Sequence, residues 1–174
     1  MKKVKLPLTI NPKKDAQHRM DYNGFFVKSQ LNRLKELVGD VLSDAQITLS
    51  LDIDSQGLTV IKGTAKVEVE LECQRCNNPF SKILDCTFSF SPVTNMNQAD
   101  ILPEIYEPVE LNEFGEINLL DTIIDEFILN LPLVPKHNDE HCEVSEANMV
   151  FGDLPDEEDE EKPNPFAVLA NLKK

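Results

Sequence analysis

Two cysteines separated by two residues are the strongest chemical signal in the sequence. Cys73 and Cys76 stand in the run Cys-Gln-Arg-Cys, and two thiolates at this spacing on a tight turn can bind one tetrahedral zinc ion from the same side. One such pair is half of a site. His137 and Cys142 are the best candidates for the other ligands, because both fall in a predicted loop and neither needs to fill the core. The sequence therefore predicts a structural zinc site of four protein ligands.

Two other interpretations of Cys73 and Cys76 stay open. They could form a redox pair, although the Asn-Asn-Pro that follows does not supply the helix of a thioredoxin-like site. They could also be inert, half-buried thiols. His141 is a weaker ligand candidate because it adjoins Cys142, and neighbours in an extended loop point apart. Cys86 is the weakest candidate, because it shares a predicted strand face with two phenylalanines.

Signals of catalysis are scarce. The sequence has no Gly-rich phosphate loop, no Gly-x-Ser-x-Gly turn and no His-Glu-x-x-His helix. A metal nuclease built from Asp52, Asp54 and Glu68 is conceivable, but alternation on a wet sheet face explains these carboxylates equally well. We therefore expect a protein without catalytic residues and without a small-molecule substrate.

The charge of the chain is strongly uneven. Of 17 basic and 31 acidic residues, nine basic and three acidic ones fall in residues 1–36, so this segment carries +6 within a chain of net charge −14. This asymmetry suggests two faces with different partners, while simple solubility is the alternative. An acidic body would repel phosphate, so any affinity for RNA would have to come through the N-terminal segment or through a basic protein. The candidate contact residues are Lys13, Lys14, Arg19, Lys28, Arg33 and Lys35.

Length and composition favour one folded domain in a reducing compartment. A chain of 174 residues with 41% hydrophobic content can bury one core. The longest apolar run, near residues 123–134, is interrupted by charges and a proline, which argues against a membrane span. The N-terminus lacks the apolar stretch of a secretory signal. We expect a cytoplasmic protein whose four cysteines form no disulfides.

Hydrophobic periodicity predicts an α+β fold. Alternation with period two indicates strands at residues 3–10, 47–53, 58–61, 65–71 and 84–90, which we expect to form an antiparallel sheet with one wet face. Asn11-Pro12, Ser29 and Asn118 are predicted to begin helices, the last of them running to Leu131. Residues 91–108 read as a loop that could cover part of the core.

The C-terminal part differs in composition from the rest. We expect one α+β domain over residues 1–152, with the basic segment 1–40 included, then an acidic linker at 153–163 and an amphipathic helix at 164–174. Phe166 and Leu169 would lie on the apolar face of this helix. The helix is then either a docking peptide for a partner or a flap on its own domain.

Six segments of the sequence resemble the YceD family, named for large ribosomal RNA subunit accumulation. They are KVKLPLT (3–9), LECQRC (71–76), EPVELNEFGEI (107–117), LPLVPKH (131–137), HCEVSEA (141–147) and KPNPFAVL (162–169). The resemblance implies a cytoplasmic role in processing or accumulation of 23S ribosomal RNA, with ribosomal RNA or a large-subunit precursor as partner, and implies no reaction. Some relatives outside this branch carry extra cysteines near His137 and Cys142, similar to a complete zinc site, where this sequence offers histidines.

Overall fold

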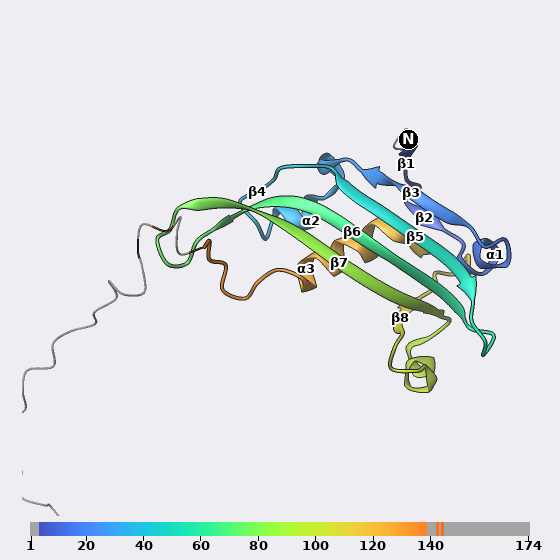
Figure 1. The fold of residues 1–174 in the computed structure, drawn as a ribbon. Helices are drawn as coiled ribbons and strands as arrows, with labels where there is room; N and C mark the ends of the chain where they lie inside the picture. The colour runs from blue at the N-terminus through green and yellow to red at the C-terminus, as the bar shows by residue number, and fades with distance from the viewer. Residues whose placement is uncertain (1–3, 139–141, 143, 145–174) are drawn as a thin grey trace, which may run out of the picture.

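A strongly curved sheet of seven strands forms the centre of the computed structural model, which describes residues 4–138, 142 and 144 (Figure 1). The strands follow one another across the sheet in the order β1 (Val4–Lys5), β3 (Asp21–Phe26), β5 (Ala45–Ile53), β6 (Thr59–Glu72), β7 (Pro79–Val93) and β8 (Glu107–Glu110). Strand β4 (Asp40–Val41) pairs with β6 beyond the point where β5 begins. Among the described residues, three α-helices accompany the sheet, so the predicted α+β class is confirmed. The predicted linker 153–163 and C-terminal helix 164–174, with Phe166 and Leu169, lie outside the described residues.

Three long antiparallel strands form most of the sheet: β5 (Ala45–Ile53), β6 (Thr59–Glu72) and β7 (Pro79–Val93). The predicted period of two is confirmed, since Ile47, Leu49 and Leu51 are buried and the residues between them are exposed. The runs at 58–61 and 65–71 belong to one continuous strand. Gly63 joins them, and a Cβ at this position would lie 2.5 Å from the Thr48 backbone oxygen.

The edges of the sheet correct the prediction of a purely antiparallel arrangement. Strand β3 (Asp21–Phe26) pairs in parallel with β1 (Val4–Lys5), and β8 (Glu107–Glu110) pairs in parallel with the end of β7. A parallel pair needs a long crossover, and residues 94–106 provide one between β7 and β8. The predicted strand 3–10 is divided into β1 and β2 (Thr9–Ile10), and β2 pairs with β9 (Ile117–Asn118) in a separate small sheet.

Helix α3 (Leu119–Leu129) lies across the inner face of the sheet (Figure 1). The Asn118 side chain accepts a hydrogen bond from the backbone N–H of Asp121, which confirms the predicted N-cap. Ile123, Ile124 and Phe127 are buried in the same hydrophobic core as the inward residues of β5, β6 and β7. One face of the sheet is therefore dry, and residues such as Thr48 and Ser50 on the other face are exposed.

The N-terminal helices are shorter than the sequence suggested. Helix α1 (Pro12–Gln17) begins at the predicted Asn11 cap. The helix expected from Ser29 instead forms a 3-10 turn, η1 (Lys28–Gln30), followed by α2 (Asn32–Lys35), and Leu37 is exposed. The reason is tertiary: the Gly39 N–H donates to the Glu70 backbone oxygen, which draws the chain out of the helix toward β4 (Asp40–Val41).

The predicted loop 91–108 has structure of its own. Its first residues extend β7, a 3-10 helix η2 covers Met96–Ile101, and its last two residues begin β8. Tyr106 covers part of the core, whereas Ile101 and Ile105 are exposed. Within residues 4–138, no helix combines the length and apolar character that crossing a membrane requires.

Candidate metal centre

The first half of the centre is the turn that joins β6 to β7. The Asn77 N–H donates to the Cys73 carbonyl at 2.8 Å, and the Cys73 N–H donates to the Asn78 carbonyl at 3.0 Å. Asn77 adopts a left-handed conformation with φ of 60°, which asparagine tolerates better than most residues. These bonds close the hairpin tightly, so that Cys73 is buried and Cys76 half-buried on the same turn.

The second half of the centre comes from the segment that follows α3. This segment runs from the end of α3 toward the β6–β7 turn (Figure 1), where the Gln74 N–H donates to the Pro135 carbonyl at 2.9 Å. The His137 ring also contacts the Phe80 ring, with 5.5 Å between centroids. These contacts position His137 and Cys142 opposite the two cysteines of the turn.

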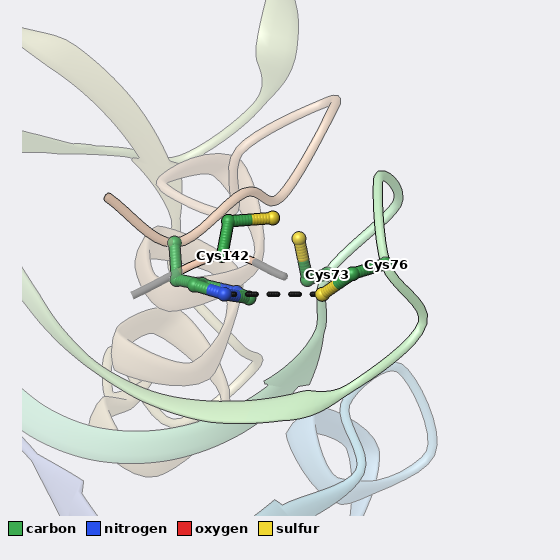
Figure 2. Close-up of side chains that lie close together, drawn as sticks. Cys73, Cys76 and Cys142 are labelled. Carbon is green, nitrogen blue, oxygen red and sulfur yellow. Dashed lines mark hydrogen bonds between the residues drawn. The ribbon is translucent and has the colours of Figure 1, made fainter. Parts of the chain in front are cut away.

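The four side chains that the sequence singles out converge at this point. The ligand atoms of Cys73, Cys76, His137 and Cys142 all lie within 4.8 Å of one another, and the Cys76 sulfur is 3.8 Å from His137 Nε2. Figure 2 shows the three sulfur atoms facing a common space. Zinc–sulfur bonds of about 2.3 Å in a tetrahedron place ligand atoms about 3.8 Å apart. The cluster therefore fits a metal ion of this size after a small contraction.

The donor set also indicates which metal would bind. Three thiols and one imidazole match the Cys3His composition of structural zinc sites, and they match hard, oxygen-preferring cations such as Mg²⁺ and Ca²⁺ poorly. Because four protein atoms complete a tetrahedron, no coordination position would remain open for a substrate. The arrangement can clamp two segments together.

The thiols of the cluster differ in acidity. Burial acts to raise the pKa of Cys73, but backbone N–H groups of His137, Arg75 and Cys76 donate to its sulfur and lower the pKa to about 6. The pKa of Cys76 is raised by burial and by the neighbouring thiols of Cys73 and Cys142. Like-charge repulsion of this kind is relieved when a metal cation binds the thiolates.

Arg75 is a member of the site that the sequence reasoning did not single out. Its Nε donates to the Cys142 sulfur at 3.0 Å, and its terminal nitrogen donates to the His137 carbonyl at 3.3 Å. The guanidinium thus holds both residues of the second half and offsets thiolate charge. The only available signal was its place between the two cysteines of the motif.

Cys86 lies outside the cluster, as its strand register indicated. It is buried on the inner face of β7, and its thiol donates to the Ala65 carbonyl. Burial and the nearby Glu126 carboxyl raise its pKa to about 11. The turn after Cys73 leads into strand β7, so the helix that a thioredoxin-like site needs is missing there.

Several of the predicted RNA-contacting cations are already paired within the domain. Arg19 pairs with Asp52, Lys35 with Asp40, and Arg33 with Asp125 and more distantly with Asp121. Lys13, Lys14 and Lys28 are exposed. Helices α1 and α2, which carry or adjoin most of these residues, lie well apart (Figure 1). The basic segment is thus distributed over the fold, and half of its candidate cations are partly neutralised.

Comparison with known proteins places the chain in a family. The family model described as "Large ribosomal RNA subunit accumulation protein YceD" matches residues 61–173. A protein of that name from Haemophilus influenzae is 62% identical over 173 residues, which cover 99% of each chain. No solved structure matches the chain. With a family model over more than half of its length and a relative this similar, the chain belongs to the YceD family of large ribosomal RNA subunit accumulation proteins.

Proposed function

We propose that this chain is a non-catalytic factor that promotes the accumulation of 23S ribosomal RNA and thereby the assembly of the large ribosomal subunit. The observation that carries the proposal is the 62% identity, over nearly the whole chain, to a relative named for large ribosomal RNA subunit accumulation. The partner would be ribosomal RNA or a precursor of the large subunit. Such a role would place the protein in the cytoplasm.

The proposal assigns the four clustered ligands to a structural zinc ion. Their distances, the Cys3His donor set and the Arg75 contacts support this assignment. When bound, zinc would link the β6–β7 turn to the segment after α3, two parts of the chain that are 61 residues apart at Cys76 and His137. Because protein residues would fill the whole coordination shell, the ion would leave no position open for a substrate. This supports a structural role, in which the ion helps to shape a binding surface.

The carboxylates considered for a nuclease support the non-catalytic proposal, because they have other roles. Asp54 accepts hydrogen bonds from the Gln56 and Leu58 N–H groups, and Asp52 pairs with Arg19. Asp52 lies opposite Val60 on β6. Glu68 is eight residues farther along that strand, which corresponds to about 26 Å. Glu68 is therefore too far from Asp52 to share a catalytic metal ion with it.

Sedimentation tests the proposal directly. Tagged protein in a cell lysate at low salt is expected to migrate with large-subunit precursor particles and to return to the top of the gradient after ribonuclease treatment. A strain lacking the protein is expected to accumulate less mature 23S RNA relative to 16S RNA, and the intact gene should restore the ratio. Migration only at the top of the gradient, together with a normal RNA ratio, would refute the proposal.

An acidic adaptor for a basic ribosomal protein is a second candidate, favoured by the net charge of −14. It predicts particle association that survives ribonuclease but is lost when the acidic segment 153–163 is deleted. The RNA-centred role predicts the opposite pattern.

A further inference from the structure

A polar pocket of about 520 Å³ lies next to the metal centre. It is formed where the start of β7 faces the segment after α3, and it shares His137 with the centre. Its polar lining consists of Asn78, Ser81, Lys82, Lys136, His137 and Asn138. Pockets that hold small ligands or single groups of a polymer have volumes of about 300–1,000 Å³, so this one has a suitable size.

The charge of the pocket is opposite to that of the chain as a whole. Among the described residues, two lysines and no carboxylate line it, although the chain has 31 acidic and 17 basic residues. Lys82 and Lys136 are exposed, and neither forms an ion pair with a carboxylate in the described part of the chain. Two lysine ammonium groups that line the same pocket, without a carboxylate partner among the described residues, suit an anion such as a phosphate.

An aromatic ring adds a second kind of recognition. Phe80 also lines the pocket, is half-buried, and packs at a tilt of 53° against the His137 ring. An aromatic side chain beside lysines is the combination that binds single-stranded nucleic acid, because bases stack on the ring while cations follow the backbone. The amides of Asn78 and Asn138 can donate to and accept from the edge of a base. An acidic peptide would use the lysines and would make no use of the ring in binding.

We propose that this pocket binds a nucleotide of single-stranded RNA, with its phosphate at Lys82 and Lys136 and its base against Phe80. The inference rests on the proposed function, which supplies RNA as the partner, and it replaces the N-terminal segment as the main RNA contact. His137 belongs both to the candidate metal centre and to the lining of the pocket, so the two features form one surface.

Fluorescence anisotropy with a short labelled single-stranded RNA of mixed sequence tests the assignment on the full chain. The variant Lys82→Ala/Lys136→Ala is expected to bind this RNA at least about tenfold more weakly. The slope of the logarithm of the binding constant against the logarithm of the salt concentration should become less steep by about 1.4, which corresponds to two lost phosphate contacts on a single strand. The matched control is Lys13→Ala/Lys14→Ala, which removes the same charge from exposed positions on α1. It should bind within about twofold of the wild type.

A third variant separates stacking from charge. Phe80→Leu keeps an apolar side chain and removes the ring, so RNA affinity should fall about tenfold, while the salt slope stays unchanged. Thermal unfolding of each variant verifies that the fold is retained. Equal losses in the two lysine pairs would overturn the assignment, because binding would then follow net charge alone. A labelled polyglutamate peptide that binds as tightly as RNA, with no effect of Phe80→Leu, would assign the pocket to an acidic protein segment instead.

Sedimentation of the same variants distinguishes the two proposals. If Lys82→Ala/Lys136→Ala still migrates with ribosomal precursors as the wild type does, the pocket assignment fails and the proposed function stands. If the wild type does not migrate with them at all, the proposed function fails regardless of the pocket.

Discussion

If the proposed zinc ion is bound, its removal should destabilise the protein by an amount that can be worked out in advance. The four ligands lie on two segments that the ion would join, so the ion should bind the folded chain far better than the unfolded one. A ligand that binds only the native state adds about 4 kcal/mol to the free energy of unfolding when its free concentration is about a thousand times its Kd. For a chain of this size, about 1 kcal/mol corresponds to about 2–4 °C in Tm. A strong chelator should therefore lower Tm by about 8–16 °C.

The assay is thermal unfolding with and without the chelator, combined with elemental analysis of the purified protein. The wild type should contain one zinc ion per chain and show the full shift. Cys76→Ser should already have the low Tm and respond little to the chelator. Cys86→Ser is the matched control, because Cys86 is a cysteine outside the cluster, and it should keep the chelator-dependent shift.

Two outcomes would refute this reasoning. If the wild type lacked zinc and its Tm did not change with the chelator, the cysteines would be inert thiols, and Cys76→Ser would shift Tm by no more than about 2 °C. If mass spectrometry found a reversible disulfide between Cys73 and Cys76 in place of zinc, the redox interpretation would hold.

Three further predictions concern single positions. Burial, and then the charge of Glu107, raises the pKa of Glu126 from 4.5 to about 7. Ionisation of Glu126 therefore opposes folding, and the stability of the wild type should fall as the pH rises from 4.5 through 7. Glu126→Gln should remove this loss and stabilise the protein by about 1 kcal/mol above pH 7 in urea unfolding, after allowance for solvent screening. The control Asp125→Asn should lose its pair with Arg33 and give no gain. A difference in unfolding free energy between Glu126→Gln and the wild type that does not change with pH would contradict this prediction. Gly63→Ala should destabilise by about 2 kcal/mol in the same assay, because the added Cβ meets a backbone oxygen at 2.5 Å and a phenyl carbon at 2.6 Å; a neutral result would mean that the strands can move apart. Arg75→Gln should lower zinc affinity about 10–100-fold in competition with a colorimetric chelator, and unchanged affinity would show that its two contacts do not support the ligands.

Features that depend on neighbouring residues could be predicted from the sequence. Alternating residues on β5 and β7 indicated strands, and Asn11 and Asn118 indicated helix starts, because side-chain direction and N-cap bonding are set within a few residues. The Cys73–Cys76 turn and the inward direction of Cys86 followed from the same local rules.

Features that depend on distant partners were predicted less well. The sequence did not predict that β1 pairs in parallel with β3 and β8 with β7, or that α2 is short. It also did not predict the ion pairs of Arg19 and Arg33 with acids elsewhere in the chain. Each is decided by which segment lies alongside, and local periodicity carries no information about that.

The candidate metal centre shows both contributions. The sequence by itself determined the ligand types and the two-residue spacing within the first pair, because a tight turn presents both thiols on one side. The sequence also offered His137 and Cys142 as the best candidates for the other two ligands. Only the tertiary structure decided that these residues meet the pair, and that Arg75, Lys82 and Lys136 lie around the site. The physical reason is that the path of the chain after α3, guided by the Gln74–Pro135 hydrogen bond, brings residues more than sixty positions apart to within a few ångströms of each other.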